Sequence, residues 1–173
     1  MTLIKIILTS LLLLFSFQNK LFSEIRYVDF KYVLNESKAG KDAQDYLKKK
    51  LENGVKNLKS KEKAIQDEEK KIIQQKKLIS AEEYKKKVTE LRSKVSSLQK
   101  ERGNLMRNVA DQRAKARNEL LKNLNPIVKK YMIDNNIQIV LDKKNILLAD
   151  DNLNITNDII VLLNKKIKTI KLD

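Results

Sequence analysis

Apolar residues recur every seven positions through the middle of the chain, and they predict two long helices packed along their length. From Ala39 to Leu124 there is no proline, and Lys, Glu, Gln, Leu and Ala, which are strong helix formers, predominate. Heptad spacing of apolar residues is typical of helices that pack side by side. The residues of the predicted seam are Leu51, Leu58, Ile65, Ile72, Tyr84, Leu91, Leu98 and Leu105.

A helix start in the middle of this segment predicts that the rod folds back on itself. Ser80 to Glu83 reads as a capping box, in which a serine caps the N–H groups that open a new helix. We therefore predict a hairpin with its turn near residues 77–80 instead of one continuous rod. In an antiparallel pair of helices, the numbers of facing residues have a constant sum. The numbers of Leu58 and Leu98 add to 156, as do those of the other three seam pairs. The layers between these pairs are polar or mixed, so we expect the two helices to flex.

Two glycines of the hairpin suggest an elbow. The numbers of Gly54 and Gly103 add to 157, which predicts that they face each other at one level of the hairpin. Each glycine weakens its helix by about 1 kcal/mol relative to alanine. The alternative interpretation is that both are tolerated, exposed glycines whose alignment is coincidental.

Short β-strands are predicted at the two ends of the chain. Ile25 to Phe30 is one, and Ile137 to Leu141 followed by a polar turn and Ile146 to Ala149 has the pattern of a β-hairpin. A sheet this small leaves open edges, so we expect the chain to oligomerise through it. The predicted core of this body and of its oligomer contains Val28, Ile139, Leu141, Ile146 and Leu148.

Helices complete the predicted body. Asn125 before Pro126 disfavours helical geometry, so the second arm helix should end or kink there before a helix over residues 127–133. Thr156 and Asp158 open a last amphipathic helix. The predicted fold is therefore mainly α. A long antiparallel helical hairpin, residues 39–124, is inserted into a small β-containing body made of residues 24–38 and 125–173.

The first 23 residues have the layout of a secretory signal peptide. A short start ending in Lys5 precedes the apolar run Ile6–Phe17, and small Ser23 follows. Twelve helical residues span only about 18 Å, which is short of the roughly 30 Å hydrocarbon core of a bilayer. We predict export and cleavage after Ser23, although Leu21 fits the cleavage pattern poorly. The alternative is an N-terminus that is not cleaved and anchors the chain to a membrane.

The composition argues against most kinds of enzyme. The chain has no His, Cys or Trp, only three Gly and one Pro, so no thiol nucleophile, imidazole base or zinc cluster can form. No glycine-rich nucleotide motif is present, so binding should need no ATP. The polar run from Asp150 to Asn154 lacks the glycine and the terminal glutamate of a calcium loop. We expect no catalytic residue, no cofactor and no metal.

Positive charge is concentrated on the predicted hairpin. The whole chain carries +15, and residues 39–124 hold 24 bases against 13 acids, a surplus of +11. Such a surface attracts nucleic acid, acidic polypeptides or anionic lipid head groups. The alternative is an ordinary solvated, lysine-rich helix. The candidate contacts for an anionic partner are the lysines nearest the turn: Lys76, Lys77, Lys85, Lys86 and Lys87.

With this layout, the chain resembles the Skp/OmpH family of periplasmic chaperones for outer-membrane proteins. Three stretches carry the resemblance: Tyr27–Asp29 with Val33–Gly40, Ile139–Asp142 with Ile146–Asp150, and Asn154–Ile160. The middle of the chain shares the lysine-rich coiled-coil character of the family but no specific motif.

The resemblance implies a homotrimer in which three helical hairpins hang from a β-rich body around a central cavity. It implies a periplasmic holdase that keeps unfolded outer-membrane β-barrel proteins soluble without ATP. It also implies that some members bind lipopolysaccharide, for which the lysines near the turn are candidates. Two rival functions remain open: a histone-like nucleic-acid binder, against which export argues, and a membrane-tethered structural coiled coil.

Overall fold

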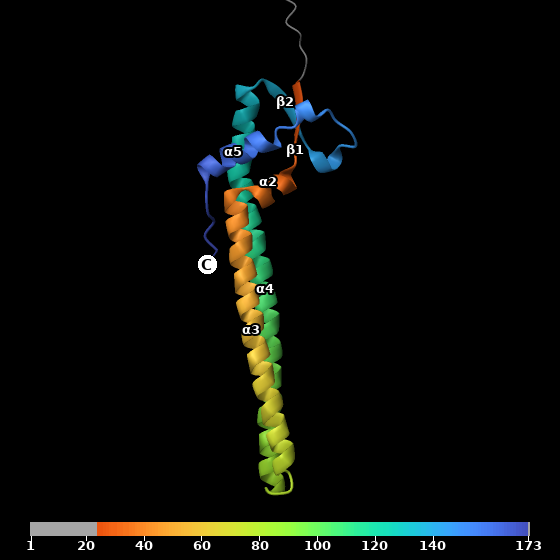
Figure 1. Ribbon diagram of the computed structural model, residues 1–173, viewed down its shortest axis with the longest axis vertical. Coiled ribbons are helices and arrows are strands. Elements are labelled where there is room, and N and C mark those ends of the chain that lie inside the picture. Colours follow the sequence, from red (N-terminus) through yellow and green to blue (C-terminus); the bar gives the residue numbers. More distant parts are fainter. Residues whose placement is uncertain (1–23, 173) are drawn as a thin grey trace, which may run out of the picture.

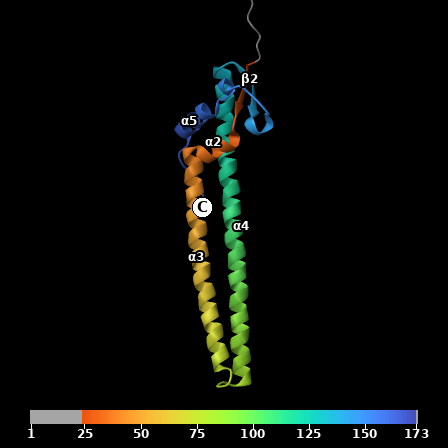
Figure 2. The same cartoon turned by 45° about the vertical axis from the view of Figure 1, so that its right-hand side comes forward.

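A long helical hairpin dominates the structure, a computed structural model that describes residues 24–172. Helix α3 (Lys38–Gln75) and helix α4 (Ala81–Asp134) run antiparallel and form the arm (Figures 1 and 2). At 1.5 Å per residue, α3 extends about 57 Å and α4 about 81 Å. The predicted mainly α fold with an antiparallel hairpin is confirmed. The predicted signal peptide lies outside the described residues.

The end of the arm farthest from the body, its tip, is closed by the predicted cap. Ser80 lies at the N-cap of α4, and its hydroxyl oxygen accepts a hydrogen bond of 3.2 Å from the backbone N–H of Glu83. Glu82 and Glu83 place negative charge in the first turn, where the helix dipole favours it. The start of α4 is therefore encoded locally in the sequence.

Replacing Ser80 with alanine should fray the first turn of α4 while leaving the body intact. The N-cap hydrogen bond is worth about 1 kcal/mol, and its loss leaves helix N–H groups exposed to solvent. Amide exchange at residues 82–84 should accelerate about fivefold. Ser60→Ala, an exposed site inside α3, is the matched control and should leave exchange at the tip unchanged. Equal protection in both variants would contradict the assigned role of the cap.

The sheet of the body contains two parallel strands. Strand β1 (Glu24–Val28) pairs with β2 (Ile137–Asp142), and the pairing places Ile25 opposite Ile139. The predicted β-hairpin is wrong, since residues 143–145 form a short 3₁₀ turn and no strand forms over 146–149. On the other edge of β1, Tyr27 bridges to Asn154. Alternating apolar residues show which segments suit a strand, but not which distant segment will pair with them.

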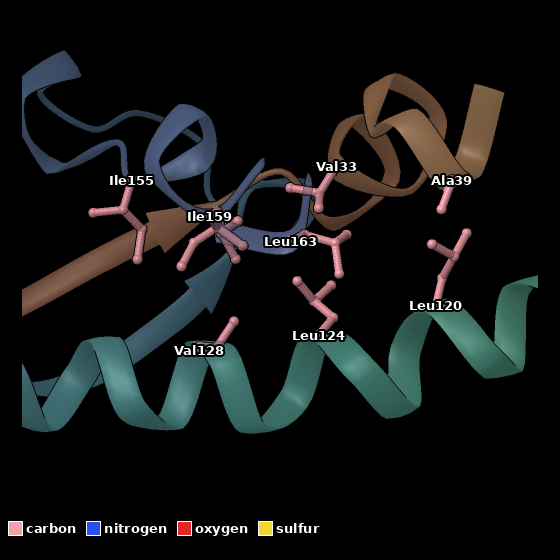
Figure 3. Close-up of a cluster of buried hydrophobic side chains, with 9 residues drawn as sticks. Val33, Ala39, Leu120, Leu124, Val128, Ile155, Ile159 and Leu163 are labelled. Carbon is pink, nitrogen blue, oxygen red and sulfur yellow. The ribbon is translucent and has the colours of Figure 1, made fainter. Parts of the chain in front are cut away.

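The core of the body gathers side chains from both ends of the chain and from the root of the arm (Figure 3). The described core comes from β1, α2 (Phe30–Glu36), α3, α4, the loop before α5 and α5 (Thr156–Lys166). The arm helices therefore contribute to the same core as the short elements. Its buried members are Val28, Val33, Ala39, Leu120, Leu124, Val128, Ile155, Ile159 and Leu163.

Most of the predicted core residues lie outside this cluster. Val28 is buried as predicted and Ile146 is half-buried, but Ile139, Leu141 and Leu148 are exposed, so assigning them to the core of the single chain is wrong. Strand β2 has apolar residues on both faces: Val140 packs against the core cluster, and Ile137 is buried at the start of the strand. A strand with two apolar faces does not reveal its inner side.

Hydrogen bonds join the two ends of the chain. The side chain of Thr156, the first residue of α5, accepts a hydrogen bond of 2.9 Å from the N–H of Asp29. The phenol of Tyr131 donates to Asp158 over 2.8 Å. Burial and this hydrogen bond raise the pKa of Tyr131. Of the two outcomes expected at Pro126, an end or a kink, the end does not occur, since helix α4 continues through the proline to Asp134. Leu124 and Val128 pack into the core on both sides of the proline and hold the helix there.

Candidate functional site: the arm and its root

The arm seam contains the predicted residues, but they pair in a different register. All eight predicted seam residues are buried or half-buried. A side chain at Gly54 would contact Leu105, and these residue numbers add to 159. Lys61 pairs with Glu101 at 2.6 Å, and these numbers add to 162. Both sums exceed the predicted 156. The prediction assumed a symmetric turn. In the structure, Lys76 lies over the ring of Tyr84, and α4 is offset along α3.

Polar contacts alternate with apolar ones along the seam. Besides Lys61 and Glu101, Lys94 pairs with Glu68 at 2.6 Å. Nearer the body, the ammonium of Lys50 donates to the buried side chain of Gln112 over 3.0 Å. Exposed ion pairs contribute only about 0.2 to 1 kcal/mol each and weaken with salt. The polar contacts of the seam therefore add little to the stability of the arm.

The two glycines do not form a shared elbow. A Cβ at Gly54 would lie 2.6 Å from the methyl groups of Leu105, whereas a Cβ at Gly103 would meet nothing within 4 Å. Gly54 thus permits close packing of the helices, and Gly103 lies exposed on the outer surface of α4. The proposed face-to-face pair is wrong because the register is offset. Both helices continue unbroken through these positions.

The predicted anion-binding lysines all lie at the tip. Lys76, Lys77, Lys85 and Lys86 are exposed, while Lys87 is half-buried and pairs with Glu83 at 3.7 Å. Among the described residues, no carboxylate lies within ion-pair distance of Lys77, Lys85 or Lys86. The hairpin turn therefore brings the two lysine runs to one end of the molecule.

Exposed apolar side chains accompany this charge along the arm. Leu78 at the tip is 82% exposed, and Ile73 lies in the last turn of α3. The heptad pattern did not identify these residues as binding candidates because they lie outside the predicted seam. Their exposure provides separate, weak apolar contacts for a partner. The exposed apolar residues of the arm are Tyr46, Ile73, Leu78, Val95 and Met106.

A groove of about 1290 Å³ lies where the arm joins the body, and we call it the root groove. Its apolar lining comes from α2, α3 and α4, and basic side chains outnumber acidic ones around it. No sequence pattern revealed it, because its walls come from segments about 80 residues apart. Its apolar lining includes Phe30, Leu34, Leu47, Leu51, Leu120 and Leu121, and its basic residues are Lys31, Lys48, Arg113, Arg117, Lys143 and Lys144.

Other kinds of site find little support among residues 24–172. In that range, no three His, Cys, Asp or Glu side chains are grouped to hold a metal ion. In the polar run from Asp150 to Asn154, the side chains form hydrogen bonds with nearby backbone groups. Asp150 accepts from the N–H of Asn152, and Asn154 accepts from the N–H of Thr156. No helix in the described range is long and apolar enough to cross a membrane. A hydrogen bond with Glu36 raises the pKa of exposed Lys41.

Fold and surface together define a class of protein in which a small α/β body carries a basic helical arm with exposed apolar side chains. The sequence profile of the family described as "Outer membrane protein (OmpH-like)" matches residues 24–163, so the chain belongs to the OmpH-like family. This confirms the resemblance found in the sequence.

One solved structure supports the same fold. A crystal structure from Caulobacter crescentus, provisionally described as an OmpH-like outer membrane chaperone, aligns with a TM-score of 0.82. The alignment covers 88% of this chain and 90% of that one at 20% sequence identity. A search among curated proteins gave no match.

Proposed function

We propose that this protein is an ATP-independent periplasmic holdase that binds unfolded outer-membrane β-barrel proteins and prevents their aggregation. The observation that carries the proposal is the pairing of exposed apolar side chains with surplus positive charge along the arm. Membership of the OmpH-like family supports the same function. A holdase needs neither a reaction centre nor a cofactor, which agrees with the composition of the chain.

Electrostatic attraction brings the client to the arm. The +11 surplus of residues 39–124 attracts an acidic client over roughly a Debye length, about 8 Å at physiological salt. Exposed apolar residues such as Leu78 and Met106, and the lining of the root groove, then hold apolar segments. Many weak contacts act together, so no single site has to bind tightly. Release follows when the client folds into the membrane.

A homotrimer would multiply these contacts around one client. Leu147 and Leu148, in the loop after β2, are 94% and 89% exposed, and Ile139 and Leu141 extend the apolar surface along β2. Water-exposed leucines on this scale favour burial against another copy of the chain. We propose that residues 24–38 and 125–173 mediate this assembly and that residues 39–124 contact the client. Lysines at the tip are the proposed contacts for lipopolysaccharide or anionic lipid.

Dilution of a urea-unfolded outer-membrane β-barrel protein into nucleotide-free buffer tests the holdase function. Residues 24–173, added at one oligomer per client, should suppress light scattering severalfold. The suppression should weaken as salt rises from roughly 50 to 500 mM, because salt screens the attraction between the client and the surface charges of the arm. Lys77→Gln, Lys85→Gln and Lys86→Gln together should weaken capture, whereas Lys129→Gln, Lys165→Gln and Lys166→Gln in the body should not. Undiminished aggregation with the unaltered chain would refute the proposal.

A further inference from the structure

An extended segment of the chain lies against the root of the arm. After α5, residues Ile167 to Leu172 leave the body and pass beside α3 (Figures 1 and 2). Ile170 packs against both the body core and a second apolar cluster. That second cluster consists of Leu172, which is buried, together with Ala43 and Leu47 of α3 and Ala116 of α4.

Side chains alone hold this segment in place. Within the described range, no hydrogen bond or ion pair connects residues 168–172 to the rest of the chain. Lys168 and Lys171 are exposed and lie beside an arm that is itself strongly positive. An extended segment with few buried contacts and solvent-exposed backbone groups opens at little cost in free energy. The segment is therefore bound and easily displaced.

The cluster under Leu172 shares three residues with the lining of the root groove. Ala43, Leu47 and Ala116 contact Leu172 and also line the groove, whose basic side chains include Lys48 and Arg117. The bound segment itself has aliphatic residues separated by polar ones, and it carries Lys168 and Lys171.

We propose that Ala43, Leu47 and Ala116 form a binding site for an extended, acidic client segment with interspersed aliphatic residues, and that residues 167–172 occupy this site until a client displaces them. The proposal rests on the holdase function proposed above and identifies one site for it. A client segment that carries carboxylates binds better than the basic segment because its charge complements the arm.

Self-occupation lowers the apparent affinity for clients by the fraction of time that the site is free. A segment docked for about two-thirds to nine-tenths of the time would weaken binding roughly three- to tenfold. Removing the apolar side chains that anchor the segment should raise the affinity for clients by this factor. Fixing the segment in place should abolish client binding at the site. The two changes act in opposite directions, which distinguishes competition from general damage to the fold.

The first test releases the segment. The probe is a fluorescein-labelled synthetic peptide with alternating valine and polar residues and two aspartates, and its binding is measured by fluorescence anisotropy. Ile170→Ser with Leu172→Ser should tighten binding about three- to tenfold, in line with the occupancy argument. Val161→Ser, at an exposed position on α5, is the control and should bind like the unaltered chain. Unchanged or weaker binding by the double variant would overturn the proposal.

The second test fixes the segment, using the absence of native cysteine. Ala43→Cys with Leu172→Cys should form a disulfide in air, detected by gel mobility, and should weaken peptide binding at least tenfold until a reductant is added. Failure of the disulfide to form, or full binding by the oxidised protein, would contradict the proposal. If the unaltered chain suppresses aggregation while neither pair of substitutions changes peptide binding, the site is wrong and the holdase function stands. If the unaltered chain does not suppress aggregation, the holdase function itself fails.

Discussion

Replacing Gly40 with alanine is expected to destabilise the body by about 3 kcal/mol, because the added methyl group has no room. Gly40 lies in the first turn of α3, where its N–H donates to the hydroxyl oxygen of Ser37. A Cβ there would overlap the carbonyl oxygen of Leu34 and lie 2.9 Å from its carbonyl carbon. Those atoms belong to the backbone of α2, so relief requires the corner between the two helices to open.

The loss should appear as a fall in the melting temperature of roughly 6 to 12 °C for a chain of this size. Circular dichroism at 222 nm measures it. Gly103→Ala provides the matched control, because its Cβ would meet nothing within 4 Å and the helix gains up to about 1 kcal/mol from alanine. Equal melting temperatures for Gly40→Ala and the unaltered chain would show that the corner has more room than the structure gives it.

Truncation of Leu124 to alanine should cost about 2 to 5 kcal/mol. Leu124 is fully buried on α4 and points toward Leu163 of α5 in the core shown in Figure 3. The substitution removes its packing against residues from several elements and leaves a cavity that these elements cannot fill without moving. Because the same core holds the root of the arm, the body and the arm should lose order together.

Urea unfolding followed by circular dichroism and by near-ultraviolet tyrosine signals should show this coupling. Ile133→Ala on the same helix is the control, since Ile133 is 69% exposed and its truncation should change stability by less than about 0.5 kcal/mol. A cost below about 1 kcal/mol for Leu124→Ala would mean that the core reorganises easily. Two separate unfolding transitions within either signal would show that arm and body unfold independently.

The arm was the part of the fold most open to prediction. Its helices follow from composition and a heptad repeat, and its turn follows from the Ser80 cap, all of which act between residues close in sequence. The pairing register was missed because Gly54 admits Leu105 closely and the turn is asymmetric. A capping box identifies where a helix begins but says nothing about how the preceding helix aligns with it.

The body was predicted only in part. Strands β1 and β2 were expected near their observed positions, but β2 pairs with β1 in parallel instead of forming a hairpin with residues 146–149. The root groove and the docking of Leu172 had no sequence signal. Each is formed by residues from separated segments, such as Leu47 with Ala116.

Sequence alone determined the two helices of the arm, the reversal between them, the location of their charge and the family resemblance, because propensity, periodicity and capping depend on neighbours along the chain. Tertiary structure decided the partner of β2, the buried side of each element, the offset between α3 and α4 and the place of residues 167–172. Those outcomes depend on how side chains that are far apart in the sequence pack against one another, and several arrangements satisfy the same local pattern. Packing in three dimensions selects one of them.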